Sequence, residues 1–190
     1  MNKNRLEALS DGVIAIIITI MAFDLKIPEL PNPFTETQVW QAQLSVLPKL
    51  FSYALSFVVL AIMWLNQHAM FDKLPHTNSK LIWYNFFLLF AMSLIPMVTN
   101  FLAAHPFLPH AVMLYGFVMS LNSLGFLLLR HYIENGAKLL PRNRLAQRSN
   151  SIALGLYVST MLFAYVSVYI SFAVFIGIPI WYFVPEKLKD

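Results

Sequence analysis

Residues 6–25 read LEALSDGVIAIIITIMAFDL, and this stretch between Arg5 and Lys26 is apolar along most of its length. About 20 residues of this kind cross the hydrocarbon core of a bilayer as one α-helix. Neither glycine nor proline falls between Val13 and Phe23, so the segment is expected to form a straight helix. The stretch therefore predicts a membrane-spanning helix near the start of the chain.

The composition of the whole chain also indicates a membrane protein. Hydrophobic residues make up 58% and charged residues 12%, and the mean hydropathy is +0.64, which leaves too little polar surface for a water-soluble globule of this size. The net charge is +4, but the basic residues lie between apolar segments and form no basic domain, so nucleic-acid binding is not expected. The chain has no cysteine, which excludes disulfides, thiolate metal sites and cysteine nucleophiles.

Further apolar segments follow a polar connector that is rich in proline. The last of them, 152–184, is apolar for 33 residues, which is long for one span and enough for two short antiparallel spans that turn near residues 167–171. We therefore predict an all-α membrane protein, a single domain over residues 1–190 with six transmembrane helices in one bundle. The predicted spans are 6–25, 44–68, 81–102, 107–129, 150–167 and 170–185.

The distribution of lysine and arginine predicts the orientation of these spans. With six spans, both chain ends lie on one side together with the second and fourth connectors, and this side holds 11 of the 13 Lys and Arg residues. Only Lys26 and Lys49 fall on the other side. Because cytoplasmic loops carry the excess of positive charge, we expect both termini to be cytoplasmic, with Lys187 and Lys189 contributing to that charge.

Asp11 is the residue of the first span that most needs a partner, because a charged side chain within a span costs roughly 3 kcal/mol on insertion scales. We expect an inter-helix network in which Asp11 pairs with Arg5 or with His68. Other polar residues at the same level of the membrane are Ser10, Asn66 and Gln67. The simplest role of such a network is to hold the first two helices together, and a proton relay is the weaker alternative.

Ser10, Asp11 and His68 are also the residue types of a hydrolytic triad. Ser10 and Asp11, however, are neighbours about 100° apart on one helix, and the sequence has no apparent glycine-rich oxyanion loop. The remaining histidines show no His-x-x-x-His spacing, which is the helical spacing of paired metal ligands. We therefore predict that the chain is not an enzyme and needs no metal site or cofactor.

One stripe of the first span combines apolar bulk with its only mid-membrane hydroxyl. At 100° per residue, Ile16, Thr19, Ile20 and Phe23 lie on one side of the helix, and Asp11 points away from them. Around an axis between subunits these residues would form rings, and apolar rings can gate ions by excluding water. Since the helix is apolar all round and most apolar spans only pack, composition alone favours ordinary packing or lipid contact for the same residues.

Two stretches of the chain resemble the lysosomal potassium channel family, transmembrane protein 175. Residues 5–12, RLEALSDG, resemble its R-x-x-x-F-S-D signature, and WLNQH at 64–68 resembles its W-x-x-H-H sequence at the end of the second span. Residues 85–99 are similar to its third span, and the spacing of all six spans fits its bacterial members. Leu9 and Gln67 depart from the family pattern, which has phenylalanine and histidine there, and Phe23 is bulkier than the usual leucine.

The resemblance implies a homotetramer whose first spans line a central pore for potassium and other monovalent cations. It places the narrowest ring at Ile16, further apolar rings at Ile20 and Phe23, and a hydroxyl ring near the passing potassium ion at Thr19. It also implies an inter-helix network of Arg5, Ser10, Asp11, Trp64 and His68. The family lacks a carbonyl selectivity filter, and this chain has no T-V-G-Y-G sequence. Membrane lipid and the other subunits are the expected partners, in a bacterial inner membrane.

Three other functions remain to be separated from a potassium channel. A secondary transporter is expected to show internal repeats and helices broken near the midplane, and only Gly177 and Pro179 interrupt the last span in that way. A proton-permeable channel would share the same architecture. A membrane enzyme would need the nucleophile and base that the sequence does not convincingly supply.

Overall fold

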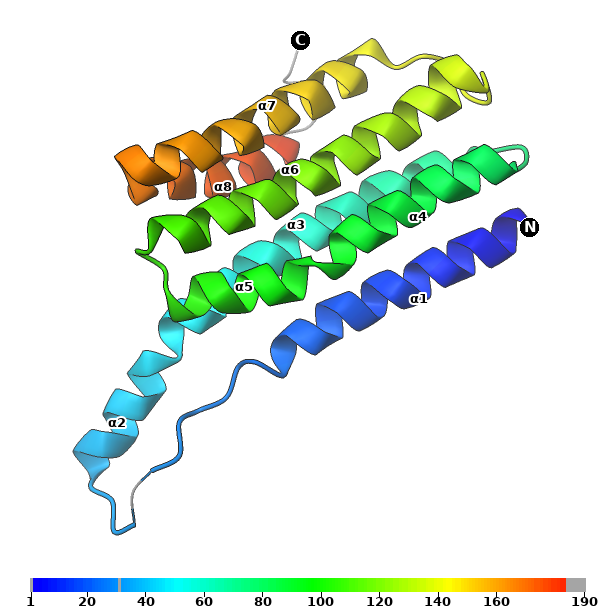
Figure 1. The fold of residues 1–190 in the computed structure, drawn as a ribbon. Coiled ribbons are helices and arrows are strands. Elements are labelled where there is room, and N and C mark those ends of the chain that lie inside the picture. Colours follow the sequence, from blue (N-terminus) through cyan, green and yellow to red (C-terminus); the bar gives the residue numbers. More distant parts are fainter. Residues whose placement is uncertain (1, 31, 184–190) are drawn as a thin grey trace.

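The computed structural model describes residues 2–30 and 32–183. Within these ranges the chain is helical and contains no strand. The helices are α1 (Lys3–Ala22), α2 (Glu36–Ser45), α3 (Leu47–Asp72), α4 (Ser79–Ser93), α5 (Ile95–Ala104), α6 (Pro109–His131), the π-helical turn η1 (Tyr132–Gly136), α7 (Arg144–Val166) and α8 (Val168–Phe183). Because α2, α4 and α6 each continue almost directly into the next element, the described residues form six helical segments (Figure 1). The predicted all-α class is confirmed.

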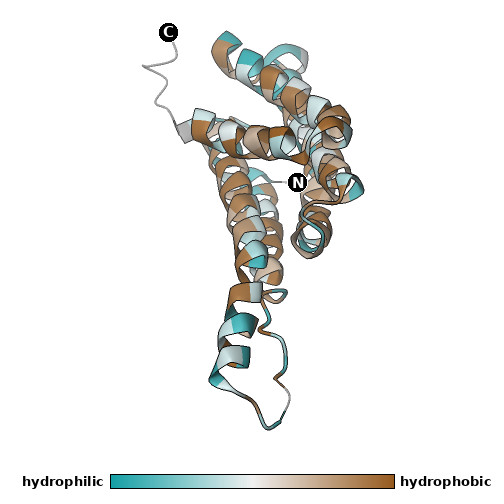
Figure 2. Ribbon diagram, turned by 90° about the vertical axis from the view of Figure 1, so that its left-hand side faces the viewer, coloured by the Kyte–Doolittle hydropathy of each residue, from teal (hydrophilic) through white to brown (hydrophobic). Residues whose placement is uncertain are grey.

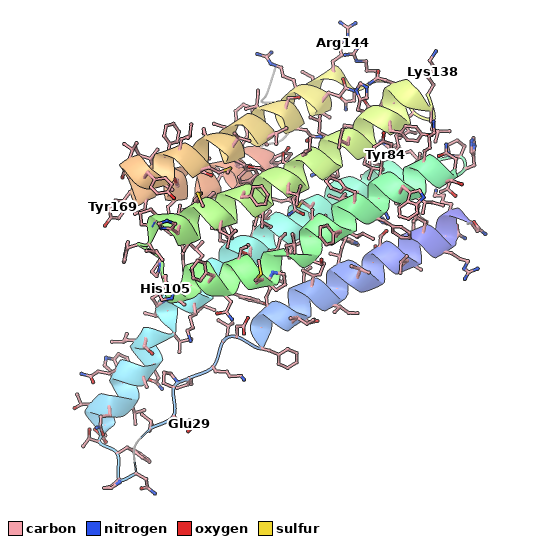
Figure 3. All side chains as sticks on the ribbon, in the orientation of Figure 1. Glu29, Tyr84, His105, Lys138, Arg144 and Tyr169 are labelled. Carbon is pink, nitrogen blue, oxygen red and sulfur yellow. The ribbon has the colours of Figure 1, made fainter. Side chains whose placement is uncertain are left out.

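The segments form one bundle with α1 at its edge. α1 packs against α3, α4 and α5, whereas α7 packs against α6 and α8. Lys138 and Arg144 lie at one end of the bundle, the end at which α1 begins, and His105 and Tyr169 lie at the opposite end (Figure 3). Two connectors that the sequence places on different sides of the membrane therefore lie at opposite ends of the fold.

Two segments are interrupted where a proline follows. Val46 separates α2 from α3 and Leu94 separates α4 from α5, and in each case Pro48 or Pro96 lies in the first turn of the second helix. Proline has no backbone N–H and its ring clashes with the carbonyl one turn earlier, so the hydrogen-bond ladder of the preceding helix ends there. α8 follows α7 after a turn at Ser167, whose backbone is extended.

α2 is a helix that the sequence analysis assigned to the connector and did not predict. Thr35 and Gln38 form a capping box at its start, which satisfies two otherwise unpaired backbone N–H groups. Residues 36–72 are one nearly continuous helix of 37 residues, about 55 Å long at 1.5 Å per residue, which exceeds the hydrocarbon thickness of about 30 Å. α2 and its connector accordingly project beyond the bundle as a largely hydrophilic hairpin (Figures 1 and 2).

Within the described residues, four segments are long and apolar enough to cross a membrane, namely 36–72, 79–104, 109–136 and 144–166. α8 is apolar but has 16 residues, and the first half of α1 carries Arg5, Glu7 and Asp11, which lowers its hydropathy. The division into six spans with the predicted limits therefore remains a prediction. Positions 184 and 185 of the last predicted span, and Lys187 and Lys189, lie outside the described residues.

The free helix face and its polar contacts as the candidate functional site

One face of α1 is buried against the rest of the bundle. Its buried residues recur every three or four positions, as the contact face of an α-helix requires. They are Leu6, Ser10, Ile14, Ile17 and Met21. Because this face runs the whole length of the helix, α1 is attached to its neighbours over its full length and has one well-defined free side.

The free side of α1 carries the predicted stripe. Ile16 is 58% exposed, Phe23 is 72% exposed, and Ile20 and Thr19 are exposed as well. One turn nearer the N-terminus, a Cβ atom built on Gly12 would meet no atom of another helix within 4 Å, so the opening continues along the helix. All four stripe residues therefore remain available to contact lipid, water or another subunit.

The Thr19 hydroxyl is bonded to its own helix. It donates to the backbone carbonyls of Ala15 and Ile16, both at 3.0 Å, as threonine commonly does within apolar helices. Because its hydrogen is used in this way, the free electron pairs of the oxygen remain on the exposed side. The side chain can therefore act as an acceptor for a cation at this level without leaving an unpaired donor.

Asp11 is linked to α3 through Trp64. The indole Nε1 of Trp64 donates to the Asp11 carboxylate at 2.8 Å, and Asp11 itself is exposed. His68 lies one turn further along α3 and stacks on the Trp64 ring, with centroids 5.3 Å apart and planes inclined by 17°. Asp11, Trp64 and His68 thus form one polar and aromatic group at the edge of the free face.

Ser10 belongs to a second, buried group. It donates to the carbonyl of Leu6 at 2.9 Å and accepts from the side-chain amide of Asn85 on α4, also at 2.9 Å. The carbonyl oxygen of Asn85 in turn accepts a short hydrogen bond from Gln67 on α3. Ser10, Gln67 and Asn85 are all buried, so this group joins three helices inside the bundle.

The structure therefore divides the expected network. Asp11 is bonded to Trp64, where the sequence analysis expected Arg5 or His68 to pair with it. Arg5 is exposed, and its side chain makes no ion pair or hydrogen bond within the described part of the chain. Asn66 donates to the Ile62 carbonyl of its own helix and joins neither group.

Asn85 was missed as a site residue, although its sequence context contains a signal. It is a lone amide in the apolar run IWYNFFLLF at 82–90, and a polar side chain in such a run needs a partner within the bundle. Its position close to the start of the third predicted span also places it near the cytoplasmic level of Ser10. Among the described residues, no three His, Asp or Glu side chains are grouped closely enough to hold a metal ion.

Known proteins resemble this chain in both sequence and fold. The family described as endosomal/lysosomal potassium channel TMEM175 matches residues 5–96. A protein from Chryseobacterium sp. (strain P1-3), named a potassium channel, is 36% identical over 133 residues, or 70% of this chain and 66% of the relative. The human protein named endosomal/lysosomal proton channel TMEM175 is 29% identical over 76 residues, or 37% of this chain and 15% of the relative.

The fold can be compared with a crystal structure of a lysosomal potassium-selective channel TMEM175 homolog from Chamaesiphon minutus. The two chains have a TM-score of 0.81 at 26% identity, and the alignment covers 95% of each. The all-α fold is thus shared with an ion channel of known structure. The chain belongs to the TMEM175 channel family, which is a family of ion channels and not of enzymes.

Proposed function

We propose that this chain is a potassium-permeable cation channel that functions as a homotetramer, with the four copies of α1 around a central pore. The observation that carries the proposal is the free face of α1. It exposes Ile16, Thr19, Ile20 and Phe23 over the length of the helix, while the opposite face is buried in the bundle.

Asp11 supports the association of subunits. Asp11 lies in the first half of α1, a helix of 20 residues, and it is exposed in the single chain. Leaving a carboxylate in lipid costs roughly 3 kcal/mol. Placing the edge of the free face against a second subunit or a water-filled axis removes that cost, and closed symmetry provides the same environment to every copy.

The chemistry of the stripe suits a narrow apolar pore. Rings of Ile16, Ile20 and Phe23 offer no hydrogen bonds to water, so they hold back ions by dewetting, with Ile16 as the narrowest ring. The Thr19 oxygens would form a ring of acceptors that replaces part of the hydration shell of a potassium ion. No carbonyl filter takes part, and a passive channel needs no cofactor.

The distribution of charge supports a bacterial inner-membrane location with both termini in the cytoplasm. Lys138 and Arg144 lie at the same end of the bundle as the start of α1 (Figure 3), and the positive-inside rule assigns that end to the cytoplasm. The α2 hairpin would then project from the outer face.

Ion flux from liposomes tests the proposal. Purified protein is reconstituted into potassium-loaded vesicles, and efflux is measured with potassium, sodium or a large impermeant cation outside. A channel gives fast downhill potassium efflux that needs no coupling ion, with slower sodium exchange. Saturating flux that requires a second ion would instead identify a secondary transporter and refute the channel.

Proton permeation is a second candidate, because the human relative is named a proton channel and His68 stacks beside the Asp11–Trp64 bond. A pH-sensitive dye inside the same vesicles separates the two. Acidification of the vesicle interior at a rate comparable to potassium efflux would favour proton permeation. Potassium efflux without acidification would favour the potassium channel.

A further inference from the structure

The cytoplasmic ends of α6, α7 and α8 meet in a corner that the pore does not use. Arg130 pairs with Glu134 at 3.1 Å, and Glu134 also accepts the backbone N–H of Asn143 at 3.3 Å. On α7, Asn150 accepts from the Tyr182 hydroxyl of α8 at 2.8 Å. These bonds fix the three helix ends relative to one another.

Three side-chain donors in this corner have no acceptor. Arg130 Nε, Gln147 Nε2 and Asn150 Nδ2 are buried, and none has a hydrogen-bond partner among the described residues. Gln147 and Asn150 are three positions apart and share one face of α7. The Glu134–Asn143 bond and the contact of Ser123 with the Asn150 carbonyl place Arg130 opposite the same first turns of α7.

The missing partner of these groups must be an acceptor. An unpaired buried donor costs about 1–3 kcal/mol, and all three groups here are donors; the charge of Arg130 itself is balanced by Glu134. The neighbouring surface adds positive charge from exposed side chains at the start of α7, namely Arg142, Arg144 and Arg148. The corner therefore favours an anion over a neutral molecule.

The corner opens into an apolar groove. Asn150, which is 6% exposed, lines a cavity of about 40 Å³ together with Ser123 and Tyr182. An adjoining groove of about 290 Å³ runs between α7 and α8, and the two share Ala153, Ile178 and Tyr182. Its other walls include Ile152, Leu156, Val174 and Gly177. The volume of the cavity suits single oxygen atoms but not a whole headgroup, whereas the volume of the groove suits part of a hydrocarbon chain.

We propose that this corner binds an anionic phospholipid of the cytoplasmic leaflet. Phosphate oxygens accept from Arg130, Gln147 and Asn150 at the mouth, and one acyl chain lies in the groove between α7 and α8. Both parts are required by the geometry, since free phosphate would leave the groove empty and a neutral lipid would not match the charge. Basic residues next to a span attract anionic headgroups by about 1 kcal/mol each.

The headgroup contacts are tested by replacements of the same shape that introduce a negative charge. Gln147→Glu and Asn150→Asp keep the oxygens that accept from Arg142 and Tyr182 and replace only the unpaired donor nitrogen by a carboxylate oxygen. Delipidated full-length protein is titrated with phosphatidylglycerol, with phosphatidylcholine of the same chains, or with inorganic phosphate, and bound lipid is counted by native mass measurement. Gln38→Glu on α2 makes the same charge change at the other end of the molecule and serves as the control.

Wild-type protein and Gln38→Glu should retain phosphatidylglycerol in preference to phosphatidylcholine. The two corner variants should bind phosphatidylglycerol about tenfold more weakly, as expected for loss of one charge-assisted hydrogen bond. Equal retention of the two lipids, or unchanged binding by both corner variants, would overturn the proposal. If the corner bound inorganic phosphate but showed no preference for phosphatidylglycerol, it would be a simple anion site, and the lipid assignment would be overturned.

The groove is tested by a second replacement that changes no charge and buries no new carboxylate. Gly177 lines the groove, and a Cβ atom built on it meets nothing within 4 Å, as is also true of Gly155 outside the groove. Gly177→Leu should therefore fill the groove and reduce phosphatidylglycerol retention several-fold, whereas Gly155→Leu should not. Equal retention by the two variants would mean that no acyl chain occupies the groove. Because the readout is bound lipid, the outcome does not depend on whether the chain conducts ions.

Discussion

Replacing Asn85 by leucine should loosen α1 from the bundle. Asn85 is fully buried, donates to Ser10 on α1 and accepts from Gln67 on α3. Leucine has a similar volume but forms neither bond. Side-chain hydrogen bonds between membrane helices average about 0.6 kcal/mol, with values up to about 1.7, and the buried amide of Gln67 would also lose its acceptor, at about 1–3 kcal/mol. The lost bond to Ser10 and the unpaired amide of Gln67 together give an expected loss of about 2–3 kcal/mol.

The free energy of unfolding in mild detergent, from an SDS titration followed by circular dichroism, measures this loss. Ser10→Ala removes only the acceptor on α1 and leaves the Gln67–Asn85 bond, so about 0.5–1.5 kcal/mol is expected. Asn100→Leu is the matched control, because Asn100 is exposed on α5 of the same helical segment and should change stability by less than about 0.5 kcal/mol. If Asn85→Leu were no more destabilising than Asn100→Leu, the buried polar group would not hold α1 in place.

Three further replacements test other contacts. Ile16→Asn should raise potassium flux and weaken the preference for potassium over sodium in the liposome assay. Ile18, about 200° round the helix, packs against the core, so Ile18→Asn should lower stability or expression instead. The reverse outcome would put the pore on another face of α1. Trp64→Phe keeps an aromatic ring for stacking but removes the donor to the Asp11 carboxylate, so the free energy of unfolding should fall by about 1–2 kcal/mol. An unchanged midpoint of thermal unfolding would show that the bond does not contribute to stability. Gly116→Ala should lower the free energy of unfolding by about 1–3 kcal/mol, because its Cβ would clash with the Thr160 hydroxyl of α7. Gly155→Ala, in open space, should be neutral or stabilising. Equal effects of the two variants in chemical unfolding would contradict the close packing of α6 on α7.

Apolar length predicted the helical class because lipid leaves a chain few alternatives. Backbone groups within a bilayer must be bonded inside their own segment, so every long apolar run had to be a helix. The same reasoning could not find α2, because most of its residues, 36–45, are polar. A local signal was nevertheless present, because Thr35 and Gln38 stand three positions apart, as a capping box requires.

The partners of individual residues depended on the relative depth of the helices, and sequence gives that depth only approximately. Ser10, Asp11, Gln67 and His68 were all expected in one cytoplasmic cluster, and the structure sorts them by face. Gln67 points into the bundle towards Asn85, while His68, the next residue, is exposed against Trp64. Neighbours on a helix point about 100° apart, and this is enough to separate the buried polar group from the group around Asp11. Depth in the membrane alone does not distinguish the two groups.

The two polar groups together explain how an apolar helix keeps one orientation. In lipid, no hydrophobic force distinguishes one apolar face of α1 from another, so packing alone leaves its rotation weakly specified. Ser10 is bonded to α4 through Asn85, and Asp11 is bonded to α3 through Trp64. Since these neighbours point about 100° apart, the two bonds act on different sides of α1 and oppose its rotation in both directions. The direction of Ile16, between one and two turns further along, follows from that constraint. Loss of either bond should therefore disturb the exposed stripe of α1 even though neither residue lies on it.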